Sequence, residues 1–350
     1  MDRLLRAKYA VSVVLTMAAF SAGAQADELQ ARANALFKPI PAQPPALPGN
    51  QATAARVALG KALYFDRRLS KSQQISCNSC HDVGTGGADQ QRTSIGHNWQ
   101  RGPRNSPTTF NAAYNFVQFW DGRAKDLAEQ AGGPMQNPLE MANTPDAVVA
   151  TLKSIPDYLP RFKAAFPGTA DPITLDNATS AIAVFEATLV TPNAPFDKYL
   201  RGDANALTHE QKEGLRTFMD KGCIACHRGV NIGGEMYAKF GLIKAPGSDI
   251  RPAADKGRFA ISKSSGDEFV YKVPTLRNIT LTAPYFHSGQ VRDLGEAVKI
   301  MGEAQLGQKL SDTDVNNIVL FLGSLTGAQP KVDYPVLPPS GPDTPAPPYP

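Results

Sequence analysis

The sequence has few of the residues that bind metals or form crosslinks. Among its 350 residues are four cysteines, five histidines and two tryptophans. Its net charge is only +4, and residues 1–26 carry +2 of that, so the remainder is near +2. This balance argues against a nucleic-acid-binding protein. Long apolar runs are also missing, because the stretch over residues 9–20 is shorter than the ~20 residues that span a bilayer.

Residues 1–26 have the pattern of a signal peptide. A basic start precedes the apolar core at residues 9–20, and Ala24-Gln25-Ala26 fits a cleavage site between small residues. A membrane anchor is the alternative. We expect export to the periplasm, cleavage after Ala26, and a product without stable membrane insertion.

All four cysteines belong to two copies of one short motif. In each copy two residues separate the cysteines, and a histidine follows the second one at once. The copies are Cys77, Cys80 and His81, and Cys223, Cys226 and His227.

This spacing is the attachment signature of c-type haem. Two thiols on one helical turn can bond the two vinyl groups of one porphyrin, and the adjacent histidine can coordinate the iron. A zinc site could also use paired cysteines, and an exported protein could use them for disulfides. Two motifs that consume every cysteine favour two covalently bound haems.

The spacing of the motifs predicts a mainly α protein with two cytochrome c-like haem domains, related by duplication and with few strands. The expected divisions are a first domain at 27–190, a second at 191–330 and a proline-rich extended tail at 331–350. Helices are predicted over 51–66, 175–189 and 315–325, and capping boxes begin at Thr208 and Ser311.

Few residues remain as further iron ligands. His97 follows the first motif in a glycine-rich loop, 84–102, from which it could reach the first haem or lie on the surface. His209 starts a capped helix and is expected to be exposed. Met301 lies between the second motif and the last helix, where small cytochromes place an axial methionine. Its alternative is a core methionine.

Several strings make the sequence similar to the bacterial di-haem cytochrome c peroxidases. The resemblance runs from about residue 36 to residue 325 and includes Gln130. The strings are LGKALYFD at 59–66, RLS at 68–70, TSIGHNWQ at 93–100, GPRNSPT at 102–108, FWDGR at 119–123, PLEM at 138–141, VPTLRN at 273–278 and APYFHSG at 283–289.

The resemblance implies a role for each haem. The haem on His81 would be the low-potential, peroxidatic one, with His97 on its distal side in the resting enzyme and leaving on activation. The haem on His227 would be high-potential with Met301 as sixth ligand. Trp120 would lie between the haems.

The resemblance also implies a distal pair, a calcium site and partners. Gln130 would hydrogen-bond peroxide, and Glu140 would move a proton between its oxygens. Asn105 and the backbone carbonyls of Thr282 and Pro284 would bind calcium at the domain interface. The expected substrate is hydrogen peroxide, the donor is a small c-type cytochrome or copper protein, and the assembly is a homodimer.

Two alternatives remain open at this point. One is a di-haem electron carrier, which needs neither Glu140, Gln130 nor a removable His97. The other is a related di-haem oxidase that matures a partner protein. That relative has tyrosine as the distant axial ligand, whereas this sequence has Met301.

Overall fold

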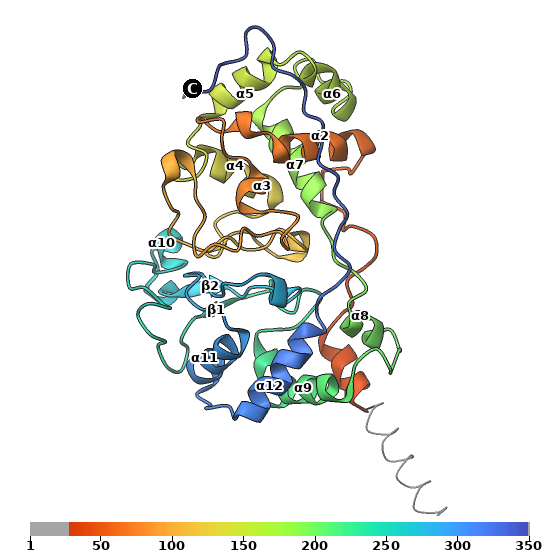
Figure 1. The fold of residues 1–350 in the computed structure, drawn as a ribbon, viewed down its shortest axis with the longest axis vertical. Helices are drawn as coiled ribbons and strands as arrows, with labels where there is room; N and C mark the ends of the chain where they lie inside the picture. Colours follow the sequence, from red (N-terminus) through yellow and green to blue (C-terminus); the bar gives the residue numbers. More distant parts are fainter. Residues whose placement is uncertain (1–27, 349–350) are drawn as a thin grey trace, which may run out of the picture.

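The computed structural model describes residues 28–348, arranged as two mainly helical lobes stacked along the long axis (Figure 1). The only named strands in this range are β1, Tyr237–Lys239, and β2, Val270–Lys272, which pair antiparallel with Tyr237 opposite Lys272. The predicted mainly α class is therefore confirmed. The expected signal peptide, residues 1–26, lies outside the described residues.

The first lobe contains the first haem motif and six labelled helices. These are α2 Ala54–Phe65, α3 Cys77–Cys80, α4 Leu127–Gln136, α5 Pro145–Ser154, α6 Tyr158–Ala165 and α7 Leu175–Ala187, with short 3-10 turns η1 Arg67–Leu69, η2 His97–Trp99 and η3 Ala112–Tyr114.

The second lobe contains the second motif. Its elements are α8 Pro195–Leu200, α9 His209–Asp220, η4 Cys223–Ala225, α10 Phe259–Ser262, η5 Ser265–Asp267, η6 Ile279–Leu281, α11 Leu294–Leu306 and α12 Asp312–Gly323, in addition to β1 and β2.

The same helix crossing supports each lobe. In the first lobe α2 packs on α7 at Gly60, where any Cβ would collide with the carbonyl oxygen of Ala181. In the second lobe α9 packs on α12 at Gly214, where a Cβ would collide with the carbonyl oxygen of Asn317. Each crossing therefore requires glycine, and the repetition supports the duplication inferred from the sequence.

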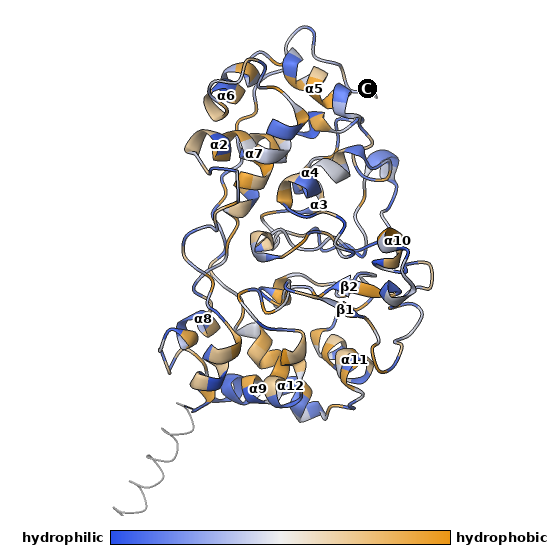
Figure 2. Ribbon diagram, turned by 180° about the vertical axis from the view of Figure 1, so that it is seen from behind, coloured by the Kyte–Doolittle hydropathy of each residue, from blue (hydrophilic) through white to orange (hydrophobic). Residues whose placement is uncertain are grey.

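An aromatic ring follows each crossing by one helical turn. Phe185 lies four residues after Ala181 and Phe321 lies four residues after Asn317, and both are buried in their lobe's core. Hydrophobic stretches lie on the helices of both lobes in Figure 2, with polar segments in the connections. Burial of these two cores stabilises the lobes separately.

Each end of the described chain packs on the lobe that is farther along the sequence from it. The helix at residues 28–36 packs in the core of the second lobe, where Phe37 contacts Phe196 at 5.3 Å between ring centroids. The domain boundary expected from the sequence placed this segment with the first motif, and its packing corrects that assignment.

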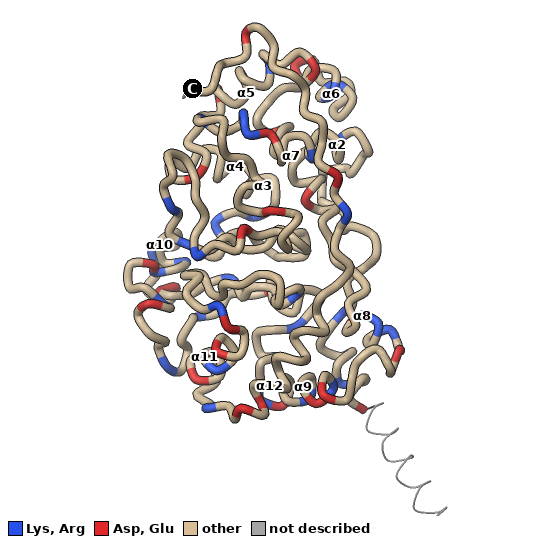
Figure 3. The backbone as a smooth tube through the Cα atoms, in the orientation of Figure 1, with Lys and Arg blue, Asp and Glu red and all other residues tan. Residues whose placement is uncertain are grey.

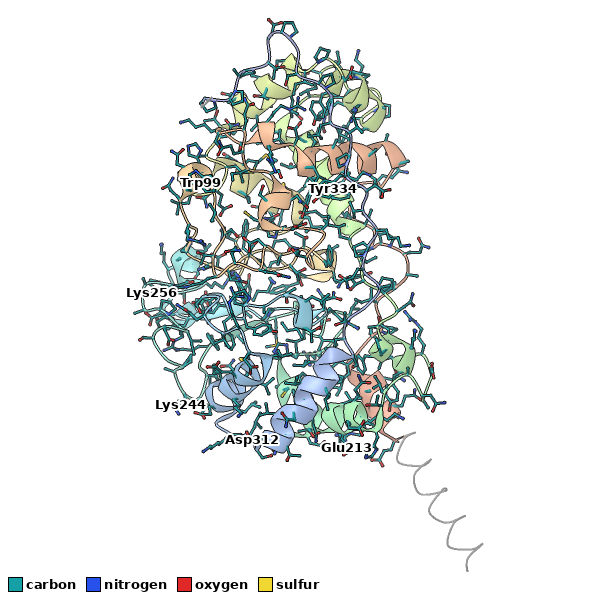
Figure 4. The ribbon with its side chains drawn as sticks, in the orientation of Figure 1. Trp99, Glu213, Lys244, Lys256, Asp312 and Tyr334 are labelled. Carbon is teal, nitrogen blue, oxygen red and sulfur yellow. The ribbon has the colours of Figure 1, made fainter. Side chains whose placement is uncertain are left out.

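The C-terminal tail crosses in the opposite direction. Residues 331–348 contain no helix or strand and run along the first lobe (Figure 1). Tyr334, labelled in Figure 4, packs on Phe65 at 4.8 Å between ring centroids. Further along, the Arg68 guanidinium donates to the Ser340 hydroxyl at 3.1 Å. The tail therefore joins the second lobe to the surface of the first.

Within residues 28–348, no helix is both long and apolar enough to cross a membrane. Acidic and basic residues are interspersed over both lobes and along their junction (Figure 3).

Candidate haem sites and distal pocket

The first motif opens onto a cavity of about 770 Å³, whose walls include Cys77, Cys80 and His81. The cysteines lie one helical turn apart on α3, which begins after Ser76. The His81 Nδ1 lies 3.0 Å from the carbonyl oxygen of Pro107. Because a carbonyl only accepts, Nδ1 carries the proton and the lone pair of Nε2 is left for a metal.

The second motif repeats this arrangement. The His227 Nδ1 lies 3.0 Å from the carbonyl oxygen of Ile232, which again assigns the lone pair to Nε2. Burial lowers the pKa of His227 to about 4 and also lowers that of His81, so both rings are neutral, as iron ligation requires.

No disulfide joins the four cysteines in the structure. Burial raises the pKa of Cys80 to about 12 and that of Cys223 to about 11. In residues 28–348 no group of three or more histidine, cysteine, aspartate or glutamate side chains could hold a metal ion. The zinc and disulfide alternatives therefore lose support, and the residues fit two thioether-bound haems with histidine ligands.

The first cavity also contains the predicted distal pair and the tryptophan. Gln130 on α4, Glu140 after α4 and Trp120 all line it together with His81. The Glu140 Oε1 accepts a hydrogen bond from Asn137 at 2.8 Å. Burial raises the pKa of Glu140, while the nearby Arg123 and the Asn137 bond partly offset this.

His97 is buried but is not among the cavity-lining residues. Its backbone N–H donates to the Glu140 carbonyl oxygen at 2.7 Å, and its Nδ1 has no hydrogen-bond partner among the described residues. The backbone of His97 is therefore held beside that of Glu140. The side chains of Gln130 and Glu140 line the cavity, and that of His97 does not.

Backbone strain follows directly after His97. Asn98 and Trp99 have φ of 53° and 61°, left-handed values that non-glycine residues seldom adopt. Trp99 is 78% exposed, at the outer edge of the first lobe in Figure 4. Uncommon backbone conformations of this kind cluster at functional sites and switch regions.

The other predicted ligands lie at the second motif or at the junction. Met301 is half-buried on α11, in the same lobe as His227. The backbone N–H of Asn105 donates to the carbonyl oxygen of His287 at 2.7 Å, three residues after Pro284. Thr282 follows directly after η6, so the three expected calcium ligands lie on segments that meet at the junction. Their ligand roles stay predictions.

Residues of the second lobe complete the wall of the first cavity, a feature that was not predicted from the sequence. Asp255, Phe259 and His287 all contribute to its wall. The Arg104 guanidinium crosses to Asp255 at 2.7 Å and also pairs with Asp121 at 2.6 Å. Arg104 and His287 lie in strings that carry the family resemblance, but the sequence had no signal for Asp255.

Two haem-attachment motifs whose histidines have the same Nδ1–carbonyl hydrogen bond, one in each half of one chain, indicate a di-haem c-type cytochrome. A family model described as di-haem cytochrome c peroxidase matches residues 54–205. The chain is 58% identical over 324 residues to the cytochrome c551 peroxidase of Pseudomonas aeruginosa, covering 93% of this chain and 94% of that one. It is 50% identical to the cytochrome c551 peroxidase of Nitrosomonas europaea, covering 89% and 90%.

A solved structure agrees with the fold. The crystal structure of a MauG-like protein associated with microbial copper homeostasis superposes with a TM-score of 0.73 at 27% identity, covering 83% of this chain and 94% of that one. The chain belongs to the di-haem cytochrome c peroxidase family. It is an oxidoreductase that acts on peroxide, which confirms the predicted class.

Proposed function

We propose that the chain reduces hydrogen peroxide to water at the haem on His81, with electrons entering through the haem on His227 and Met301. The observation that carries this assignment is that Gln130 and Glu140 share one cavity with His81, and His97 does not line it. The cavity would hold the haem attached beside His81, and Gln130 and Glu140 would face a small ligand bound there.

The distal residues supply the proton chemistry. The reaction takes up two electrons and two protons for each peroxide and yields two waters. The haem irons supply a binding position and the electrons. The Glu140 carboxylate accepts the proton of the nearer peroxide oxygen and gives it to the departing one, and the Gln130 amide orients the bound molecule.

The rest of the proposal concerns location, partners and control. The chain works in the periplasm as a homodimer and takes electrons from a small c-type cytochrome or a copper protein. Calcium binds at the junction through Asn105, Thr282 and Pro284, and His97 ligates the first iron at rest. The closeness of Asn105 to the segment after Pro284 supports the calcium site.

The test is made on protein matured in cells with haem-attachment machinery. Two haems should remain with the polypeptide after acid-acetone extraction, and the half-reduced protein should oxidise a reduced small cytochrome c when peroxide is added. Stoichiometric reduction without peroxide turnover would instead identify an electron carrier. Haem in the organic phase would overturn covalent attachment.

A further inference from the structure

Four carboxyls line the first cavity, and the mechanism above does not use that of Glu186. Glu186 lies near the end of α7, is only 4% exposed and contributes to the cavity wall. Its Oε2 has no hydrogen-bond partner among the described residues. Burial alone raises the pKa of Glu186 to about 8, so without a positive charge nearby the carboxyl holds its proton at pH 7.

The position of Glu186 has an equivalent in the second lobe, and the residue there shows what the packing of the fold requires. Phe185 and Phe321 occupy equivalent positions after the two glycine crossings. The residue that follows is Glu186 in the first lobe and Leu322 in the second, where it is 3% exposed and packs in the core. The duplicated fold therefore accepts an apolar residue here, and a buried carboxyl is not needed to form the crossing.

We propose that Glu186 is the redox-linked proton-binding site of the first haem. When the iron is reduced, one electron arrives from the second haem and one proton from solvent binds the Glu186 carboxylate. When the iron is oxidised, the electron leaves and the acid returns its proton. The inference rests on the proposed function, which places the peroxidatic haem in this cavity.

The reason is electrostatic. Ferric haem carries one more positive charge than ferrous haem, and a nearby positive charge favours the carboxylate over the acid. Inside a low-dielectric cavity this interaction is strong, and within residues 28–348 no cation shifts the pKa of Glu186 in the opposite direction. The other carboxyls of the cavity already have partners. Glu140 is coupled to Arg123 and bonded to Asn137, and Asp121 and Asp255 pair with Arg104.

The other titratable groups around Glu186 do not replace it. Tyr64 of α2 and Cys77 of α3 interact with its charge, but burial raises the pKa of both and keeps them neutral. The other titratable groups on the elements packed on α7 do not line the cavity. These are Arg56 and Lys61 of α2, Tyr114 of η3, Glu129 of α4, and Asp146 and Lys153 of α5.

The experiment measures the midpoint potential of the first haem against pH by optical redox titration of the holoprotein. The wild type should show a falling potential, approaching about 59 mV for each tenfold change in proton concentration between the pKa values of the two redox states. Glu186→Gln and Glu186→Leu should abolish most of this slope, and Glu140→Gln should keep it. The leucine variant carries the second lobe's own residue and keeps the test usable if glutamine disturbs folding.

Infrared redox-difference spectra of the Glu140→Gln protein provide a second readout. A protonated-carboxyl band should appear on reduction and vanish when Glu186 is also replaced. A pH-independent potential in the wild type, or a slope that survives both Glu186 variants, would overturn the inference. Peroxide turnover is measured separately. A wild-type potential that does not depend on pH, with turnover intact, would count against this inference alone, whereas a pH-dependent potential without turnover would count against the proposed function alone.

Discussion

The carbonyl oxygen of Asn105 accepts a hydrogen bond from the Trp120 indole at 2.9 Å, while its backbone N–H donates to His287 in the other lobe. One residue thus connects the tryptophan of the first cavity to the second lobe. If its side chain also binds calcium, Asn105→Ala should weaken calcium binding, because an oxygen ligand is lost.

Asn105→Asp is the matched variant, since it keeps an oxygen ligand and adds a negative charge that favours Ca²⁺. Calorimetric titration with calcium should therefore show weaker binding for alanine and undiminished binding for aspartate. Equal affinities in all three proteins, or activity of the wild type that ignores a chelator, would remove the calcium proposal.

Replacing the proposed sixth ligand of the second haem should change its potential. Met301→His should lower that potential, because imidazole stabilises ferric iron more than a thioether sulfur does. Met219→Leu is a suitable control, because Met219 is a buried core residue of the same lobe. Redox titration should show a shift only in the first variant, and an unchanged potential in Met301→His would assign the ligand elsewhere.

The local structure was readable from the sequence, but long-range packing was not. The capping boxes at Thr208 and Ser311 form as predicted and start α9 and α12. The last helix was expected at 315–325 and observed at Asp312–Gly323, because the cap fixes its start directly after Ser311.

What the sequence could not show depends on pairs far apart in the chain. The Arg104–Asp255 pair joins residues 151 positions apart, and the packing of Phe37 on Phe196 moves the N-terminal helix to the second lobe. The cavity was likewise not predictable as a joint product of both lobes. Each such contact depends on tertiary geometry, for which neither periodicity nor motif spacing is informative.

A buried ion pair should hold the second lobe together. The Arg277 and Asp197 side chains are fully buried and lie 2.8 Å apart. Arg277→Leu would leave Asp197 charged and unpaired, so we expect a loss of about 3–5 kcal/mol in the free energy of unfolding. The partly exposed pair of Arg216 with Glu213 is the control, and Arg216→Leu should cost under about 1 kcal/mol. Denaturant unfolding, followed at the second haem, measures the loss of stability in each variant. Equal losses in the two variants would contradict the prediction.

The pH dependence of turnover should report Glu140. Burial raises the pKa of Glu140 above the ordinary 4.5, so its carboxylate, the form that accepts a proton, is lost as pH falls through this higher value. The acid limb of kcat/KM should therefore lie above the ordinary carboxyl range. Glu140→Gln should remove the limb and slow turnover by about 10²–10⁴-fold. Glu129 is exposed, and Glu129→Gln should keep both the acid limb and the wild-type rate. An acid limb that persists in Glu140→Gln would show that another group causes it.

The conformation of the loop that contains His97 should determine whether the enzyme must be reduced by one electron before it reacts with peroxide. The structure holds His97 outside the cavity wall, with its backbone bonded to Glu140 and strained residues directly after it. The proposal requires a second arrangement, in which the imidazole ligates the first iron and closes the pocket. Two such arrangements, biased by the charge of the second haem, are what a reductive switch requires.

His97→Gly removes the ligand from the closed arrangement and leaves the cavity-lining residues unchanged. The variant should have a high-spin first haem when fully oxidised and should react with peroxide without pre-reduction, whereas the wild type should be low-spin and slow until one electron is added. His209→Ala replaces an exposed histidine at the start of α9 and should behave as the wild type. Electron paramagnetic resonance of the oxidised proteins gives the spin state, and stopped-flow mixing with peroxide gives the rate. A His97→Gly protein that stays low-spin and inert until reduced would show that another residue closes the first haem, because the imidazole is then absent and the block persists.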